Sequence, residues 1–230
     1  MTRLIKKIDT QINLDKLKYA PEFNYKESNY ASMEFPEIGN IDLFSIVSEP
    51  SKNSSQETKS ELLYLSNLTK NLSQSQKDLV YKIDKNAGAL LEDFIKENSI
   101  KFPYNFFTSV FYTCLIAMVD HLKFYYNRPR PYQIADHYHI EINRIVTKSH
   151  KTPAYPSGHT MYAALMAEMI IDKYPQYKKQ VSQLVDLCGK ARELQGVHYP
   201  SDNTASKKIV KTIYPELKKY YIAVGVTDEL

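Results

Sequence analysis

The chain is short of the residues that hold small secreted domains together. Its 230 residues contain two cysteines, six glycines and no tryptophan. Two cysteines cannot build a disulfide framework, and a chain of this length buries roughly 70% of its unfolded surface without one. Cys114 and Cys188 lie in apolar, helix-like stretches, so we interpret them as free buried thiols of a protein in a reducing, cytoplasmic compartment. A disulfide between the two is the alternative that the sequence leaves open.

Long apolar runs are also missing. The first nine residues are rich in charge and contain no apolar core of a signal peptide. The best candidate for a membrane span covers residues 102–119, but Pro103 and Asn105 interrupt it and it runs directly into Asp120 and His121. A buried core helix fits this segment better than a transmembrane one, so we expect no integral membrane association.

Neither sign of charge is in strong excess. The 30 basic and 26 acidic residues leave a formal net charge of +4, which favours anionic ligands weakly and is too small to mark a nucleic-acid-binding protein. The hydrophobic share of 43% and the charged share of 24% are ordinary for a soluble globular protein. We therefore expect a small-molecule partner and no nucleic acid.

Helical periodicity dominates the chain. Strand patterns are nearly absent, and the sequence predicts an all-α domain over residues 49–230. Its helices are expected at roughly 56–70, 73–97, 104–127, 159–173, 176–195 and 202–213. Pro215 should stop the last helix, and a loop of about 25 residues should follow the third. Residues 1–48 predict an irregular N-terminal arm with one short helix near 10–19.

The first chemically informative segment joins a lysine to two arginine–proline pairs. Lys123 lies on a polar stripe of the expected 104–127 helix, and Arg130-Pro131 follows after six intervening residues. Prolines at 129 and 131 force an extended backbone, and arginine in a stiff loop suits forked recognition of phosphate. The alternatives are a solvated helix face, with Lys123 paired to Asp120, and a solvated basic turn.

A second segment, Pro156-Ser157-Gly158-His159, directly precedes an expected helix. With Ser157 or Gly158 at the N-cap, free backbone N–H groups would point outward and the helix dipole would add to their attraction for an anion. Gly158 also lacks the side chain that would block a close approach. Plain helix capping by Ser157 is the alternative, but it does not account for His159.

The third segment carries Arg192, His198 and Asp202. Arg192 falls on the core face of the expected 176–195 helix, where a charge needs a partner unless it snorkels at the helix end. His198 follows in a loop after Gly196. Asp202 opens the next helix, either as an acid that favours the helix dipole or as the group that fixes the tautomer of His198.

The four remaining histidines form no convincing set of metal ligands. No carboxylate or cysteine cluster completes a site with His137 and His139, so we expect no metal. We interpret both, together with His121 and His150, as surface or loop residues. His150 and its neighbouring lysines precede the serine–glycine turn closely enough to line the mouth of a site.

In this order, the three segments resemble the signature of the superfamily of type-2 phosphatidic acid phosphatases, bacterial non-specific acid phosphatases and vanadium haloperoxidases. That signature is K-x6-R-P, then P-S-G-H, then S-R-x5-H-x3-D, and the one departure here is Ala191 in place of the small hydroxyl residue. The motifs span residues 123–202. The helical run from about residue 50 looks like soluble bacterial members, whereas the arm before residue 48 resembles none of them.

The resemblance implies a helical-bundle core and a phosphomonoester hydrolase that uses no metal or other cofactor, with vanadate as a phosphate mimic or inhibitor. By it, His198 attacks phosphorus and becomes phosphorylated, Asp202 orients His198, and His159 protonates the leaving oxygen. The phosphate oxygens would be bound by Lys123, Arg130, Arg192, Ser157 and the backbone N–H of Gly158. Simple chemistry agrees, because positioned cations stabilise the charge on the three equatorial oxygens of the transition state.

Three alternatives remain open. A vanadate-dependent haloperoxidase would use the same anion cradle but is usually far longer. A lipid or diphosphate phosphatase of the integral-membrane branch would need several transmembrane helices. A non-catalytic anion-binding module would use the cations alone and would have no need for His159, His198 and Asp202 together. The sequence does not choose among nucleotides, sugar phosphates, small acidic phosphates and soluble lipid phosphates as substrate.

Overall fold

The computed structural model describes residues 13–225, and within this range the chain forms helices and no strands, which confirms the all-α fold. The α-helices are α1 (Leu43–Ile46), α2 (Gln56–Thr69), α3 (Gln74–Lys85), α4 (Ala89–Glu97), α5 (Tyr104–Val110), α6 (Ile116–Tyr126), α7 (Pro131–Ala135), α8 (Gly158–Lys173), α9 (Lys178–Leu194) and α10 (Pro200–Ala223). A π-helical turn, Phe111–Leu115, joins α5 to α6 without a break. Short 3-10 turns are Leu14–Lys16, Tyr25–Glu27, Asn29–Ser32, Pro36–Ile38, Asp136–Tyr138 and Pro175–Tyr177.

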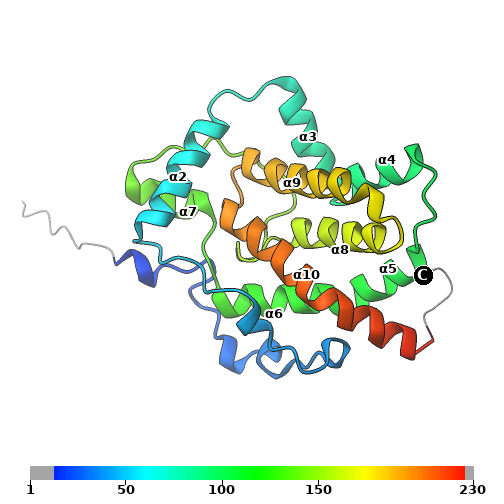
Figure 1. Ribbon diagram of the computed structural model, residues 1–230. Helices are drawn as coiled ribbons and strands as arrows, with labels where there is room; N and C mark the ends of the chain where they lie inside the picture. Colours follow the sequence, from blue (N-terminus) through cyan, green and yellow to red (C-terminus); the bar gives the residue numbers. More distant parts are fainter. Residues whose placement is uncertain (1–12, 226–230) are drawn as a thin grey trace, which may run out of the picture.

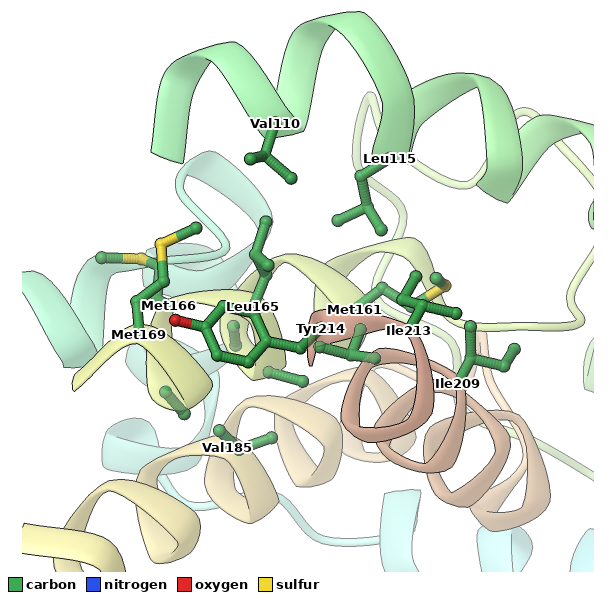
Figure 2. Packing of buried hydrophobic residues seen from close by; sticks show 14 of the residues in the cluster. Val110, Leu115, Met161, Leu165, Met166, Met169, Val185, Ile209, Ile213 and Tyr214 are labelled. Atoms are coloured by element: carbon green, nitrogen blue, oxygen red, sulfur yellow. The ribbon is translucent and has the colours of Figure 1, made fainter. Parts of the chain in front are cut away.

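Helix α8 is the centre of the bundle and lies between α9 and α10 (Figure 1). Most of its residues are buried, because its sequence is apolar on nearly every side. In Figure 2, Leu165 of α8 points toward Val110 and Leu115 of the α5–α6 segment, which belong to the same core. Ile213 of α10 lies on another side of the same core. The helix that begins with the serine–glycine motif is therefore anchored by core packing along its length.

Most of the expected helices are confirmed. Helices α2, α8 and α9, and the continuous α5–α6 segment, match their predicted ranges to within about two residues. The predicted capping box at the start of α3 is also present. The Ser73 hydroxyl accepts from the backbone N–H of Gln76 at 3.3 Å, and the Gln76 side chain accepts from the N–H of Ser73 at 2.8 Å. None of the helices within residues 13–225 is long and apolar enough to cross a membrane.

The prediction of one helix over 73–97 is wrong, because the chain turns between α3 and α4. Asn86 leaves the helical conformation, and its side chain accepts a hydrogen bond from the N–H of Gly88 at 2.9 Å. A Cβ on Gly88 would lie 2.7 Å from both Met166 and Tyr162. The turn therefore lets the start of α4 pack directly on α8, a contact that helical periodicity alone does not indicate.

The prediction that Pro215 stops the last helix is also wrong. Helix α10 runs through Pro215 to Ala223. A proline within a helix removes one backbone hydrogen bond and crowds the preceding turn. Ile213, Leu217 and Tyr221 flank the proline and are all buried in the main core. Tertiary packing therefore outweighs the local helix-breaking tendency.

The long loop after α6 contains a helix that periodicity did not predict. Asn127 ends α6 in the left-handed conformation, with φ +46°. Pro131 then occupies the first turn of the short helix α7, where its fixed φ is favourable and its missing N–H costs nothing. Helix α7 packs with α2 in a second, smaller core that includes Leu62, Leu65 and Ile134.

The N-terminal segment packs on the bundle through short 3-10 turns, near α6 and α10 (Figure 1). Residues 10–12 of the expected short helix lie outside the described range, and Leu14–Lys16 form a single 3-10 turn. His121 is buried under this segment, where its Nδ1 lies 2.7 Å from the carbonyl oxygen of Tyr30. The prediction that His121 is a surface or loop residue is therefore wrong. His137 and His139 are exposed, as expected.

Two neighbouring leucines of α2 test how strongly the smaller core anchors this helix. Leu62 is fully buried, whereas 46% of Leu63 is exposed. We expect Leu62→Ala to lower the free energy of unfolding by about 2–5 kcal/mol, because the deleted methyl groups leave a cavity. Leu63→Ala should change it by less than about 0.5 kcal/mol. Urea denaturation of both variants measures the difference, and equal effects would contradict the packing of α2 described above.

Candidate functional site

A cavity of about 270 Å³ opens beside the first turn of α8. Six of the eight residues predicted from the sequence line it, and they come from α6, the start of α7, α8, α9 and the loop before α10. These six residues are Lys123, Arg130, Gly158, His159, Arg192 and His198. The other two, Ser157 and Asp202, lie directly behind the lining residues and are fully buried. Folding therefore gathers three segments that are far apart in the sequence around one cavity.

Both ring nitrogens of His198 have a polar neighbour. Nδ1 lies 2.9 Å from Oδ2 of Asp202, and Nε2 lies 2.8 Å from Nη1 of Arg130. Arginine only donates hydrogen bonds, so the lone pair is on Nε2 and the proton on Nδ1 is donated to the carboxylate. Burial, followed by the charges of Arg130 and Lys123, lowers the pKa of His198 well below its ordinary value. The ring is therefore neutral near pH 7 and keeps one tautomer.

Asp202 is itself held in place by an arginine. Its Oδ1 accepts from Nη1 of Arg128 at 2.6 Å, and its Oδ2 also accepts from the backbone N–H of Tyr199 at 3.0 Å. The guanidinium of Arg128 lies 3.8 Å from the centroid of the Tyr199 ring and donates to Glu61 of α2 at 3.1 Å. A chain of charge-assisted hydrogen bonds thus runs from α2 to the ring of His198.

Two of the cavity cations are satisfied by backbone carbonyls. Nζ of Lys123 donates to the carbonyl of Pro153 at 2.5 Å. The guanidinium of Arg130 donates to Thr152 at 2.8 and 3.0 Å and to Val197 at 2.8 Å. Burial lowers the pKa of Lys123 well below its ordinary value and that of Arg130 to about 10. A carbonyl satisfies a donor without cancelling its charge, so positive potential remains at the cavity.

Arg192 has a carboxylate partner from another helix. Its Nη1 donates to Oδ1 of Asp84, on α3, at 2.8 Å, and its Nη2 donates to the hydroxyl of Ser149 at 2.7 Å. Burial acts to raise the pKa of Asp84, but hydrogen bonds from Arg192, Ser149 and Thr147 outweigh it and hold the pKa below its ordinary value. Nε of Arg192 is buried and has no partner among the described residues. Such an unpaired donor is uncommon in folded proteins.

The first turn of α8 presents its backbone and a histidine to the cavity. Gly158 and His159 line it. The hydroxyl of Ser157 instead caps the helix, accepting from the N–H of Thr160 at 3.4 Å and lying 3.0 Å from the Thr160 hydroxyl. Burial and the charge of Arg192 lower the pKa of His159 to about 3, against a smaller opposing effect of Asp84.

Part of the cavity lining is apolar. It is formed by Ala87, Phe111, Ile116, Val119 and Tyr162. Phe111 meets Tyr162 edge to face, with ring centroids 4.6 Å apart. Phe111 begins the π-helical turn and Ile116 directly follows it, in line with the frequent occurrence of such turns at functional sites. Asp120 lies in the same lining, and burial raises its pKa.

Sequence reasoning missed the residues that hold the predicted ones in place. The sequence indicates only that Arg128 belongs to the stiff, basic Arg-Pro-Arg-Pro turn, whereas its side chain pairs with Asp202 and Glu61 and does not line the cavity. Asp84 gave no signal, because its contact with Arg192 joins residues 108 positions apart. The stiff Arg-Pro-Arg-Pro run could have suggested two arginines with separate partners. Nothing in the sequence pattern indicates the contacts of Asp84 or Glu61.

The pairing of Asp84 with Arg192 predicts a pH-dependent contribution to stability. A carboxylate whose pKa is lowered by folding stabilises the protein above its unfolded pKa, near 4, and loses this effect as the pH falls toward the folded value. We expect Asp84→Asn to lower the free energy of unfolding by about 1–3 kcal/mol at pH 7. The difference from wild type should shrink as the pH falls from about 5 to below 3.

Asp93 provides the matched control for this measurement. It forms an ion pair with Lys82 on the surface, and 54% of its side chain is exposed. Asp93→Asn should change stability by less than about 1 kcal/mol at pH 7. Denaturation curves of both variants at several pH values give the comparison. A wild-type advantage over Asp84→Asn that stays constant or grows in acid would contradict the role given to the Asp84 carboxylate.

Comparison with known proteins finds matches to the segment that carries the three motifs. Residues 105–209 match the family model of the PAP2 superfamily. A stretch of 87 residues, 38% of this chain, is 30% identical to the non-specific acid phosphatase of Salmonella typhimurium strain LT2 and covers 34% of that protein. The match thus spans about a third of the curated relative's length. The resemblance inferred from the three motifs is therefore confirmed over residues 105–209, the segment that contains all three motifs and matches the PAP2 superfamily.

Proposed function

We propose that this protein is a phosphomonoester hydrolase that acts through a phosphohistidine on His198 and needs no metal. The observation that carries the proposal is the fixed tautomer of His198, whose Nε2 lone pair lies at a cavity lined by three cations. A neutral imidazole with an unprotonated Nε2 is a nucleophile once Arg130, which donates to that nitrogen, turns to the phosphoryl group of a bound substrate. A binding module would need the cations but would have no use for a buried aspartate that orients the ring.

The cations suit a phosphoryl group. Lys123, Arg130 and Arg192 surround the cavity, and the start of α8 adds backbone N–H groups and the positive end of its dipole. In phosphoryl transfer, negative charge is spread over the equatorial oxygens of the transition state. Fixed positive groups around that position lower the barrier without any reorganisation at the moment of reaction. Ser157 would support this arrangement by capping the helix.

The two histidines divide the reaction into two steps. The Nε2 lone pair of His198 forms the N–P bond as the P–O bond to the leaving group breaks, and His159 gives its proton to the departing oxygen. Water then attacks phosphorus and gives a proton to His159. The N–P bond breaks in this second step, inorganic phosphate is released and His198 recovers its lone pair. His159 therefore acts as a general acid in the first step and as a general base in the second.

The low pKa of His159 is consistent with this role. It follows from burial and from the positive charges nearby. A phosphate dianion bound among those charges would offset them, so substrate binding would raise the pKa and favour protonation of the ring. The histidine would then carry its proton only when there is a leaving oxygen to receive it.

The substrate we propose is a small, soluble phosphate ester. Its phosphoryl group would lie among the cations, and its organic part would lie against Phe111, Ile116 and Tyr162. The described cysteines, Cys114 and Cys188, are both buried, and neither forms a disulfide. Burial raises the pKa of Cys188 to about 12, which keeps its thiol protonated and unreactive. These free thiols support a reducing, cytoplasmic location, which we propose together with the function.

Substitution of the site histidines tests the two roles. We expect His198→Ala to lower turnover of every ester by roughly 10³-fold or more, because no covalent intermediate can form. His159→Ala should lower turnover of alkyl phosphates by roughly 10²- to 10⁴-fold and that of nitrophenyl phosphate much less, because a good leaving group needs little protonation. Asp202→Asn should have an intermediate effect. His139→Ala, an exposed histidine outside the cavity, is the matched control.

Trapping the intermediate identifies the nucleophile directly. Wild-type protein mixed with labelled substrate and denatured in alkali should keep the label on His198, since phosphohistidine survives alkali and is lost in acid. Label on His159, or substantial turnover by His198→Ala, would reverse the assignment. A protein that binds phosphate but hydrolyses no ester would be an anion-binding module instead.

Chelation and vanadate separate the proposed reaction from a metal-dependent hydrolysis and from a vanadate-dependent haloperoxidase. Activity should survive prolonged treatment with EDTA, because fixed side chains supply all the positive charge that the proposal needs. Vanadate should compete with the substrate, since it becomes five-coordinate on a histidine. Loss of activity in EDTA that magnesium or zinc restores would refute the metal-free reaction. Oxidation of bromide by peroxide with added vanadate, without ester hydrolysis, would favour a haloperoxidase.

A further inference from the structure

A third histidine reaches the cavity from the loop that precedes α8. His150 lines the cavity together with Arg130, Arg192 and His198. It lies outside the three sequence motifs, and none of the steps proposed above uses it. Its presence at the cavity fits the expectation that this part of the loop lines the mouth of a site, and its local geometry suggests more than a passive wall.

The backbone of His150 is held in an unfavourable conformation. Its φ is +65°, in the left-handed region that residues other than glycine rarely adopt. The hydroxyl of Tyr19 donates to the carbonyl of His150 at 3.4 Å, so the N-terminal segment braces this position. Backbone strain that is supported by distant contacts is frequent at functional sites. The contacts of the ring then indicate what His150 does.

The ring has one buried and unpartnered nitrogen. Nδ1 is buried without a hydrogen-bond partner among residues 13–225. The ring lies edge-on to Tyr132, with centroids 6.2 Å apart, and the guanidinium of Arg144 covers the face of Tyr132. A buried N–H with no acceptor costs free energy, and nearby arginines favour a lone pair at this atom. The proton of the neutral ring therefore belongs on Nε2.

The charge around His150 favours a neutral donor. Burial, followed by Arg130, Arg144 and Arg192, lowers its pKa to about 4, while Asp84 opposes the shift. Near pH 7 the ring thus adds no further positive charge to a cavity that three cations already line. A neutral imidazole with its proton on Nε2 can still donate one hydrogen bond. An anion beside Arg130 and Arg192 is the ligand whose oxygens accept such a bond.

We propose that His150 is a further substrate-binding residue, whose Nε2–H donates a hydrogen bond to an oxygen of the phosphoryl group held by Arg130 and Arg192. This inference rests on the proposed function for the identity of the ligand. It adds to the cavity a neutral donor that the three motifs do not include. It also explains the strained backbone of His150, because this conformation directs the ring from the loop toward the cavity.

Two substitutions separate this role from a backbone role. The amide nitrogen of glutamine lies near the position of histidine Nε2, whereas that of asparagine lies near Nδ1. Asparagine is the residue that tolerates the left-handed conformation better. If the Nε2 donor matters, His150→Gln should bind inorganic phosphate within about threefold of wild type, and His150→Asn should bind about tenfold more weakly. If only the backbone matters, asparagine should be the better replacement.

His139 is a matched control, because it also has a left-handed backbone, with φ +54°, but is exposed and does not line the cavity. His139→Gln and His139→Asn should leave phosphate binding unchanged. Titration calorimetry with inorganic phosphate measures all four variants and wild type. Binding by His150→Asn that equals wild type, or equal loss in both His150 variants, would overturn the proposal.

Magnetic resonance gives a second measurement that needs no variant. In protein labelled with ¹⁵N, the Nε2 signal of His150 should move when inorganic phosphate is added, and the signals of His137 and His139 should not. A His150 signal that does not respond to saturating phosphate would overturn the proposal. Both measurements are independent of turnover, so a protein that binds phosphate through His150 yet hydrolyses no ester would refute the proposed function alone. Normal hydrolysis with no effect of His150 would refute this inference alone.

Discussion

Burying several positive charges around one cavity is the constraint on which the rest of this structure depends. Lys123, Arg130 and Arg192 are each less than 5% exposed, and Arg128 lies close behind them. An unpaired buried charge is costly, so each of these groups needs polar partners that the fold must supply. Some of these cations pair with carboxylates and others with backbone carbonyls, and this difference determines where positive potential remains.

Carboxylates pair with two of the cations and backbone carbonyls with the other two. Asp202 and Glu61 pair with Arg128, and Asp84 pairs with Arg192. Lys123 and Arg130 donate to carbonyls, which satisfy their N–H groups but leave their charges in place. An anion that enters the cavity would supply the missing negative charge. Burial, together with this distribution of positive charge, lowers the pKa values of the two site histidines, His159 and His198.

The scaffold serves this arrangement through elements outside the motifs. Helix α3 brings Asp84 to Arg192, and α2 brings Glu61 to Arg128. The turn at Gly88 lets α4 pack on α8, and the π-helical turn between α5 and α6 places Phe111 and Ile116 in the cavity wall. The N-terminal segment braces the loop that carries His150. Residues that belong to none of the three sequence motifs therefore hold the motif residues in place at the cavity.

Much of this could be predicted from the sequence, since it depends on local patterns. Helical periodicity located α2, α5–α6, α8 and α9, because an amphipathic or wholly apolar helix shows its burial in residue order. The spacing of the motifs identified the lining residues Lys123, Arg130, His159, Arg192 and His198. Each of these residue types has a chemistry that can be named before its neighbours are known.

The tertiary structure alone decided the rest. Helix α10 continues through Pro215 because packing of its flanking residues outweighs a local preference. The burial of His121 under the N-terminal segment and the contacts of Asp84, Glu61 and His150 depend on which distant segments meet. Sequence determines what a side chain can do, whereas its charge partners and its protonation state follow from the packing of segments that are remote along the chain.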